Sequence, residues 1–198
     1  MAGGLPGAAA PSRPLPPARG PAERPPFLAA GFVEHERLHL LRRGVDPLRG
    51  ARSAARLRRF RRPDLPTVLQ VDHLAFPAFW RFDEQAIEDA VEATPAARFR
   101  VAVVPEVPEP VGYAITGRAG SRGYLQRLAV HPDHRRQGLA SVLVDDGLRW
   151  LRRWGAREVL VNTQESNAGA LALYEALGFD RQPEGLAVLR RDLTAGGR

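Results

Sequence analysis

The chain has 198 residues, of which 44% are hydrophobic, and it contains no cysteine. This length fits one domain of ordinary size with an additional segment, and the apolar content excludes wholesale disorder. The lack of cysteine excludes disulfide scaffolds, thiol nucleophiles and thiolate metal sites. No run of about eighteen apolar residues is present, and residues 1–20 lack the apolar core of a secretory signal. We therefore expect a soluble, cytoplasmic protein.

The positive charge is concentrated at the front of the chain. Residues 1–62 hold 13 Arg against four acidic residues, a net charge of +9, whereas the remainder has a net charge of −2. Binding to nucleic acid would rest on this front third. No aromatic platform or known binding motif accompanies the arginines, so we do not expect a nucleic-acid partner. The densest basic group is Arg56, Arg58, Arg59, Arg61 and Arg62.

The first third of the chain divides into three segments. Residues 1–26 hold eight of the 18 prolines with Gly, Ala and Arg, and this composition predicts a disordered tail. Residues 27–48 show alternating apolar and polar positions, which predicts a structured piece too short to be a domain. Residues 49–54 are interpreted as a linker, and the main domain is expected over residues 55–196.

Strands and helices alternate in the main domain, which predicts an α/β or α+β layer fold with a mixed sheet. Asp64 and Asp83 are expected to cap the first two helices. A proline-rich turn should join the second and third strands. Along the third helix, Trp154 is expected in the buried face and Asp145 in the solvent-facing one. The expected strands are 57–61, 99–104, 111–117, 123–130 and 159–162, with two short strands within 179–192. The expected helices are 65–76, 83–94, 138–154 and 167–177, and the other buried positions of the third are Leu139, Val142, Leu143 and Leu151.

A candidate anion site lies between the strand ending near Val130 and the helix beginning at Gly138. The first turn of a helix has unpaired N–H groups and a partial positive charge, and small residues let a phosphate approach the backbone. Arg135 and Arg136 add formal charge there. The pattern lacks the residues of a P-loop and of a dinucleotide fingerprint. It predicts a pyrophosphate site, with a plain strand–helix connection as the alternative.

A second constellation follows at residues 167–179. Asn167 and Tyr174 are seven residues apart, which places them on one face of a helix, and Gly178-Phe179 follows. Taken singly, Asn167 could be only an N-cap, Tyr174 only a core aromatic and Gly178 only a helix stop.

Over residues 55–193, and most strongly over 125–179, the sequence resembles the GNAT superfamily of acyl-CoA-dependent N-acetyltransferases. In motif style it is nearest to the ribosomal-protein N-acetyltransferases. The family's Gln/Arg-x-x-Gly-x-Gly/Ala motif corresponds to residues 135–140. Its Asn-x-x-Ala-x-x-Leu-Tyr and Gly-Phe motifs correspond to residues 167–174 and 178–179. The resemblance implies a mixed sheet with helices on both faces, splayed between its fourth and fifth strands (123–130 and 159–162). It also implies acetyl-CoA as acyl donor, held by Leu128, Ala129, Val130, Arg135, Arg136, Gln137, Gly138, Leu139, Ala140, Ser141, Asn167 and Tyr174.

The implied reaction is direct attack by a neutral amine on the thioester, with no metal. The carbonyl oxygen needs a donor, most simply the backbone N–H of Leu128 or Val130. Tyr174 suits protonation of the departing thiolate, because a phenol is largely protonated at neutral pH.

The general base is where the sequence departs from the family. The two positions at which relatives carry a glutamate are Asn162 and Tyr124 here. Glu165 and His131 are the local candidates, and we assign no base. Because an acidic base is missing, a non-catalytic CoA-binding regulatory module is the alternative function.

The acceptor is expected to be a primary amine, either a peptide N-terminus or a small amine. The aromatic connection 76–82 would either staple two helices to the sheet or give the acceptor cleft an apolar wall; its rings are Phe76, Phe79, Trp80 and Phe82. A homodimer is left open.

The front segment repeats the end of the main domain. With an offset of 147, residues 27–32 overlay 174–179, and with one residue of gap, residues 38–43 overlay 186–191. We interpret residues 27–48 as a remnant of a preceding acetyltransferase domain. A lone strand pair is marginal in water, so we expect residues 31–43 to form strand structure packed on the main domain or on a second chain. Phe32, Leu38 and Leu40 should be buried.

Overall fold

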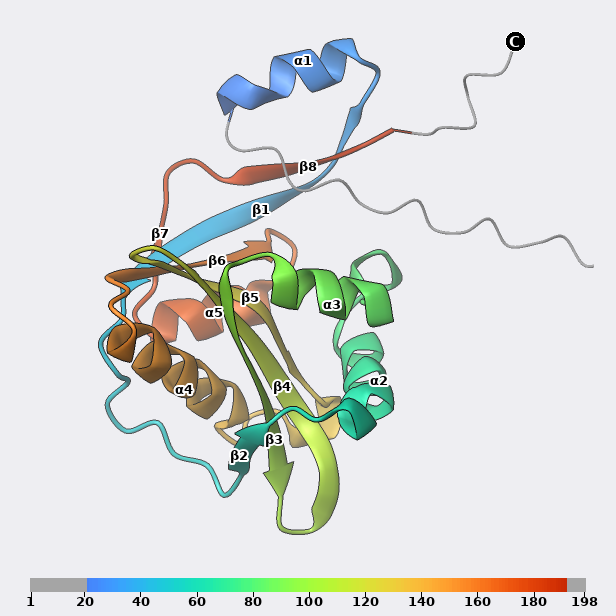
Figure 1. Cartoon of the computed structure of the whole chain (residues 1–198). Coiled ribbons are helices and arrows are strands. Elements are labelled where there is room, and N and C mark those ends of the chain that lie inside the picture. The colour runs from blue at the N-terminus through green and yellow to red at the C-terminus, as the bar shows by residue number, and fades with distance from the viewer. Residues whose placement is uncertain (1–20, 192–198) are drawn as a thin grey trace, which may run out of the picture.

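A computed structural model of the chain describes residues 21–191. It contains one mixed eight-stranded sheet with the order β2-β3-β4-β5-β6-β1-β7, in which β8 also pairs with β1 (Figure 1). Of the tail predicted for residues 1–26, residues 1–20 lie outside the described part. The strands are β1 Val33–Gly44, β2 Arg56–Arg59, β3 Ala96–Val104, β4 Val107–Ala119, β5 Arg122–Val130, β6 Glu158–Gln164, β7 Asp180–Arg181 and β8 Leu186–Arg190. The helices are α1 Arg24–Ala29, α2 Leu65–Ala75, α3 Glu84–Glu92, α4 Leu139–Arg153 and α5 Ala168–Ala176, with short 3-10 turns at Pro21–Glu23, Arg62–Asp64, Ala78–Trp80 and Pro132–His134.

The sheet splits between β5 and β6. These strands run parallel but pair only where Arg122, Gly123 and Tyr124 face Glu158, Val159 and Leu160. Beyond that point β5 pairs only with β4, and β6 only with β1. The predicted splayed mixed sheet is therefore confirmed, with the expected fourth and fifth strands being β5 and β6.

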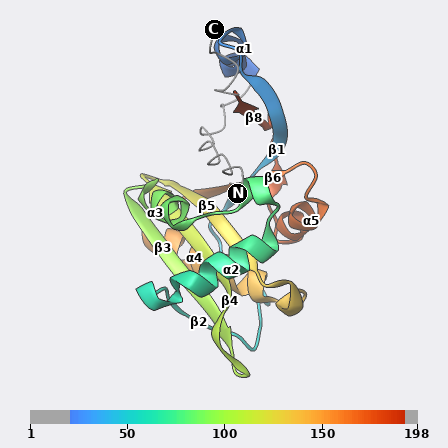
Figure 2. The same ribbon diagram turned by 90° about the vertical axis from the view of Figure 1, so that its right-hand side faces the viewer.

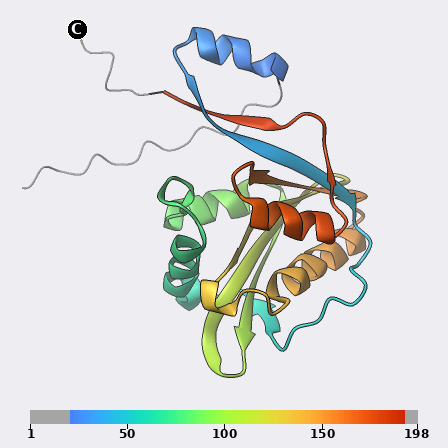
Figure 3. The same cartoon turned by 180° about the vertical axis from the view of Figure 1, so that it is seen from behind.

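Helices cover the two faces of the sheet separately. α2 and α3 lie on one face, whereas α4 and α5 lie on the other (Figures 2 and 3). Two buried apolar clusters follow this division: one joins α4 to the sheet, and the other places α2 and Ile87 of α3 against β3, β4 and β5. No helix within residues 21–191 is long and apolar enough to span a lipid bilayer.

The buried face of α4 differs from the prediction at two positions, Asp145 and Trp154. Trp154 is 58% exposed because it follows the last helical turn, whereas Asp145 is only 9% exposed. The segment after β1 runs along α4 and covers Asp145, whose carboxylate accepts from the Leu48 N–H (2.7 Å) and from Arg149 Nε (2.7 Å). A contact between segments far apart in the sequence thus buries a residue that helical periodicity assigned to solvent.

Two local predictions also fail. The proline-rich turn shrinks to residues 105–106, because β4 begins at Val107 and includes Pro108 and Pro110. Both prolines lie before Gly112, the residue at which β4 begins to pair with β5. The edge of β4 that faces β5 is therefore unpaired at the prolines, and proline, which has no N–H, is tolerated there. Asp64 does not cap α2 through its side chain. Its carboxylate instead forms a bidentate pair with Arg58 (2.6 and 2.7 Å).

Part of the basic group is neutralised within the fold. Arg58 is paired with Asp64, and Arg62 forms ion pairs with Glu84 and Glu88 of α3. These two arginines therefore bind the segment around β2 to neighbouring elements, and they contribute less to any nucleic-acid-binding surface than the sequence suggested.

The front segment is more ordered than predicted. α1 begins inside the expected 1–26 tail, because proline is tolerated in a first helical turn and Arg24 pairs with Glu34 of β1 (3.3 Å). The expected strand over 31–43 is confirmed as β1, which pairs with β6, β7 and β8 of the main domain. Leu38 is buried as predicted, whereas Phe32 and Leu40 are only half-buried; the second fully buried leucine is Leu41, in the core on the α4 side.

The end of α1 has the same local geometry as the end of α5. Gly31 and Gly178 both have left-handed backbones (φ +82° and +79°) and each follows the helix. The next residue then turns its ring edge-on to a helical ring, Phe32 to Phe27 at 5.7 Å and Phe179 to Tyr174 at 5.5 Å. In Figure 1, α1 lies at the far end of β1 and β8, away from the other helices.

Candidate active site

A cleft of about 710 Å³ occupies the opening between β5 and β6. It reaches from the start of α4 to the α2–α3 connection and to the first turns of α5. Residues 125–130 form one wall, and residues 161–164 form the opposite wall. Of the residues expected to bind the cofactor, those that line the cleft are Leu128, Ala129, Val130, Arg135, Arg136, Gly138, Leu139, Ala140, Ser141, Asn167 and Tyr174. Gln137 is not among them, and its side chain donates to the Asp133 carbonyl at 3.4 Å.

The loop before α4 has an unusual backbone. Gly138 is the N-cap residue with φ +76°, and Arg136 adopts φ +64°, which is rare for a residue with a side chain. A Cβ at Gly138 would collide with the carbonyl oxygen of Arg52. Glycine is therefore required at position 138 for two reasons: it adopts the left-handed backbone, and it leaves room for the backbone of Arg52 to pass close by. The first N–H groups of α4 have no partners within the helix, so they can bind an anion.

The open edge of β5 presents backbone donors to the cleft. The N–H of His131 donates to Val111 O of β4 at 2.8 Å. Because backbone groups alternate in direction along a strand, the N–H groups of Val130 and Leu128 point to the other edge. That edge is unpaired beyond Tyr124. Two donors are thus available in the opening to a ligand carbonyl or amide.

Tyr174 lies at the bottom of the opening on α5. Its side chain is only 6% exposed yet lines the cleft, and its ring packs edge-on against Phe179. Burial raises the pKa of Tyr174 well above its ordinary value, while the charge of Arg127 acts in the opposite direction. The phenol therefore keeps its proton at neutral pH. Asn167 caps α5 by accepting from the Ala170 N–H at 3.0 Å, and it lines the cleft as well.

The candidates for a base are not gathered in the cleft. Asn162 is exposed and lines it, but an amide cannot take up a proton. Within residues 21–191, neither His131, Glu165 nor Tyr124 is part of the cleft lining. His131 instead accepts from the Asp133 N–H, at 3.3 Å. No Asp or Glu of the described chain lines the cleft itself.

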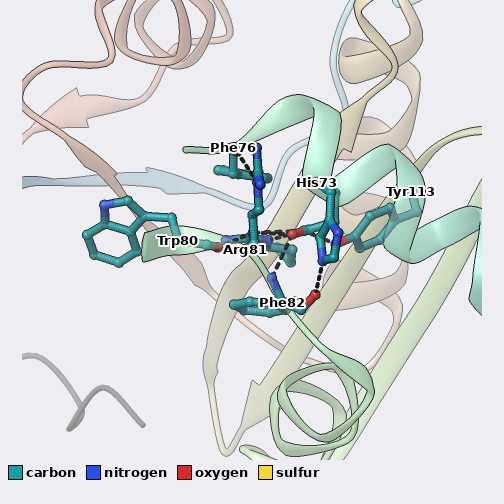
Figure 4. A network of polar contacts seen from close by, with 8 residues as sticks. His73, Phe76, Trp80, Arg81, Phe82 and Tyr113 are labelled. Atoms are coloured by element: carbon teal, nitrogen blue, oxygen red, sulfur yellow. Dashed lines mark hydrogen bonds and ion pairs between the residues drawn. The ribbon is translucent and has the colours of Figure 1, made fainter. Parts of the chain in front are cut away.

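Sequence reasoning missed a buried ion pair between Arg127, in the wall of the cleft, and Asp72 of α2. Figure 4 shows the network of polar contacts around it. Arg127 donates to both carboxylate oxygens of Asp72 at 2.8 Å, and to the Trp80 carbonyl at 2.6 Å. Asp72 is completely buried, and it also accepts from the Phe82 N–H at 2.8 Å and from the Tyr113 hydroxyl. The pair joins α2 and the α2–α3 connection to β5. A charged residue on an apolar helix face was the available signal, because Asp72 lies four residues after the buried Val68.

Aromatic residues of the α2–α3 connection hold this pair in place. The Arg127 guanidinium lies between the rings of Phe76 (3.5 Å) and Phe82 (3.8 Å). Stapling the helices to the sheet thus fits Phe76 and Phe82. These two rings and Trp80 also line the cleft, so the alternative role, an apolar wall for the acceptor, fits as well. Phe79 and Trp80 contact β1 too: Phe79 packs on His35 with ring centres 4.0 Å apart, and Trp80 Nε1 donates to Glu36 at 2.7 Å.

A second cavity, of about 820 Å³, adjoins the α4 N-terminus on the side of the 45–52 segment. It shares Gly138 and Ser141 with the cleft, so the two spaces meet at the candidate pyrophosphate loop. Its basic lining residues are Arg43, Arg49, Arg52 and Arg152. Within residues 21–191, no group of three His, Asp or Glu side chains is arranged to hold a metal ion.

Comparison with known proteins agrees with this geometry. A sequence model described as the acetyltransferase (GNAT) family matches residues 65–179. N-alpha-acetyltransferase 30 of Schizosaccharomyces pombe is 38% identical over 60 residues, 30% of this chain and 40% of that protein. The [ribosomal protein bS18]-alanine N-acetyltransferase of Escherichia coli is 36% identical over 88 residues, 43% of this chain and 56% of that protein. The chain thus spans about half the length of these curated relatives.

Solved structures show the same fold. The Escherichia coli ribosomal-protein-S18-alanine N-acetyltransferase has a TM-score of 0.57 at 22% identity, covering 68% of this chain and 91% of that one. A tandem GNAT protein from the clavulanic acid biosynthesis pathway has a TM-score of 0.63 at 18% identity, covering 86% of this chain and 59% of that one.

Proposed function

Because this chain belongs to the GNAT family of acetyltransferases, we propose that it moves an acetyl group from acetyl-CoA to a primary amine. The observation that carries this proposal is the divergence of β5 and β6 after three paired residues, Arg122 to Tyr124. The opening brings together two free N–H donors of β5, the N-terminus of α4 and the hydroxyl-bearing ring of Tyr174.

Acetyl-CoA fits this arrangement in three parts. The pantetheine amides would bond to the open edge of β5, in the manner of an added strand. The pyrophosphate would lie on the N-terminus of α4, with Arg135 and Arg136 beside it. The basic cavity beside Gly138 would receive the phosphorylated nucleoside end, because its four arginines next to the same loop outnumber its one acidic residue, Asp46, which pairs with Arg152 at 3.5 Å.

The acetyl transfer needs two proton movements besides the attack. The acceptor ammonium first loses a proton, and its nitrogen then forms a bond to the thioester carbon. The N–H of Leu128 or Val130 stabilises the charge that develops on the carbonyl oxygen. When the carbon–sulfur bond breaks, Tyr174 gives its proton to the sulfur and regains one from the nitrogen that has become an amide. The products are the N-acetylated acceptor, free CoA thiol and one proton released to solvent.

The first proton is taken up through water in this proposal. Asn162 occupies the position of the family's carboxylate and can hold a water molecule but cannot accept a proton. The same residue favours the second candidate function, a CoA-binding regulatory module without turnover. The two candidates differ in one measurement, the release of free thiol from acetyl-CoA in the presence of amines.

A protein N-terminus is the acceptor class that we propose. Two curated relatives carry names that specify N-alpha or ribosomal-protein alanine acetylation, and this supports the class without identifying the target. Incubation with acetyl-CoA and a panel of peptides with free N-termini should release thiol, whereas matched N-acetylated peptides should not. Asn162→Glu should change the pH dependence of this rate if position 162 lies beside the amine. A protein that binds acetyl-CoA but releases no thiol with any amine would support the regulatory module instead. The cytoplasmic location and a homodimer remain predictions.

The division of the chain is part of the proposal. Residues 55–196 would form the catalytic domain, and residues 27–48 would be the remnant of a preceding acetyltransferase domain. The repeated helix–Gly-Phe–strand geometry at Gly31 and Gly178 supports this origin. Phe27 stands where Tyr174 would be, so the remnant has no acid of its own.

A further inference from the structure

Within the described residues 21–191, one carboxylate stands at the rim of the cleft without a cationic partner. Glu36 of β1 is half-buried, and its Oε2 accepts from Trp80 Nε1 at 2.7 Å. Its Oε1 accepts from the Ser166 hydroxyl at 2.8 Å. Both partners are neutral, so they orient the carboxylate but leave its charge uncompensated. Glu34, two residues earlier, is instead paired with Arg24 and Arg37.

The surroundings of Glu36 are those of the acceptor side of the cleft. Leu38, two residues further along β1, lines the cleft and is only 2% exposed, and side chains two apart in a strand share a face. Trp80 lines the cleft, and Ser166 precedes Asn167, which lines it too. The carboxylate therefore bridges two walls of the opening, the α2–α3 connection and the loop between β6 and α5.

Glu36 is too far from the reaction to be its base. Leu40 pairs with Asn162, which stands in the wall beside the opening, and Glu36 precedes Leu40 by four residues. Four strand residues span about 13 Å. Within residues 21–191, the other carboxylate bonded to the α2–α3 connection, Asp72, is completely buried and saturated by donors. A group at the rim can therefore act only on a part of the acceptor remote from the reacting nitrogen.

We propose that Glu36 is a specificity-determining residue that binds a cationic group of the acceptor about 13 Å from the amine that is acetylated. The indole of Trp80 beside it favours a cation by the charge distribution of its ring. Each carboxylate oxygen accepts one bond and has capacity for a second, which suits a guanidinium or ammonium. For an extended peptide, the distance corresponds to a basic side chain about four residues from the N-terminus.

This inference rests on the proposed acetyl transfer to peptides, and its site lies on β1, outside the residues 65–179 that match the family. The test uses Glu36→Gln in the full chain. Gln can still accept from Trp80 through its oxygen and donate to Ser166 through its nitrogen, so the bridge is kept and only the charge is removed. Glu34→Gln is the matched control, because it removes the same charge two residues away on the same strand.

The first measurement is thiol release with peptides of otherwise uncharged side chains, in which Arg or Gln is placed at each position from the second to the sixth. The wild type should prefer Arg near the fifth position, four residues beyond the first, by about fivefold to thirtyfold in kcat/KM, mainly through KM, as for a partly desolvated ionic hydrogen bond. In Glu36→Gln the Arg peptide should fall to the level of the Gln peptide, whereas Glu34→Gln should keep the preference. A wild type without preference at any position, or a Glu36→Gln variant that retains it, would overturn the inference.

A second measurement separates this inference from the proposed function. If the wild type acetylates no peptide, the proposed acceptor class is wrong, but binding can still be compared. Calorimetric titration with N-acetylated Arg and Gln peptides, in the presence of CoA, should show tighter binding of the Arg peptide to the wild type. Equal binding of the two peptides to the wild type, or an equal preference in Glu36→Gln, would again refute the role of Glu36.

Discussion

Breaking the ion pair between Asp72 and Arg127 should destabilise the protein more than any exposed ion pair does. Asp72→Ala would leave the Arg127 guanidinium, whose side chain is only 7% exposed, without its counter-charge. It would also leave the Phe82 N–H and the Tyr113 hydroxyl without their acceptor. Loss of one member of a buried pair costs about 3–5 kcal/mol, because the other charge remains out of water.

Substitution of the partner, Arg127, leaves a different group buried without its counter-charge. Arg127→Met keeps an unbranched apolar chain between Phe76 and Phe82 but leaves the Asp72 carboxylate buried with two neutral donors. The double variant removes both charges at once. It should therefore cost less than the sum of the single variants by about 2 kcal/mol or more, since neither charge is left alone.

Urea unfolding followed by circular dichroism measures these differences. With a slope of about 2 kcal/mol per molar urea, a loss of about 4 kcal/mol lowers the midpoint by about 2 M. Glu84→Ala, which removes an exposed partner of Arg62, is the control and should cost no more than about 1 kcal/mol. Additive effects of the two buried substitutions, or an Asp72→Ala cost as small as the control, would refute the reasoning.

Three further outcomes are expected. Tyr174→Phe should lower turnover by about 10²–10⁴-fold while acetyl-CoA affinity barely changes, and an unchanged rate would reduce Tyr174 to a core aromatic. Because burial raises the pKa of Tyr174, the wild-type rate should show no loss of this acid between neutral pH and about pH 10. Replacement of both Arg135 and Arg136 by Gln should shrink the rise in melting temperature that acetyl-CoA causes, and an identical rise would place the pyrophosphate elsewhere. The hydrogen bond from Arg58 lowers the pKa of Asp64, so Asp64→Asn should lower the free energy of unfolding by about 1 kcal/mol at pH 7. The difference should fade as the pH drops below about 4, because the wild type then loses the same charge. A difference independent of pH would contradict this origin.

The sequence alone was sufficient for the fold class and for much of the cleft. The loop 135–140 and the pair Asn167 and Tyr174 depend on local chemistry, namely a helix N-terminus, small residues beside it and a spacing of two helical turns. Such features are readable from neighbouring residues because a helix or a strand end is itself local. Eleven of the twelve residues named for the cofactor line the cleft.

Contacts between distant segments lay beyond the reach of periodicity. Asp145 reads as a solvent-facing helix position, and only the passage of residues 45–52 over α4 shows that it is buried. Arg127 and Asp72 are 55 residues apart, so helix periodicity can mark Asp72 as a charge on an apolar face but cannot identify its partner. Their burial is favourable only because each supplies the other's counter-charge in the tertiary structure.

The position of the front strand was likewise decided by the tertiary structure. Alternation and the repeated Gly-Phe motif predicted a strand near residues 31–43, but not its neighbours in the sheet. Strand pairing is a long-range choice, because any strand edge offers the same backbone donors and acceptors. β1 pairs with the edge of β6 that faces away from β5. This placement brings Glu36 to the rim of the cleft, next to Trp80 and Ser166.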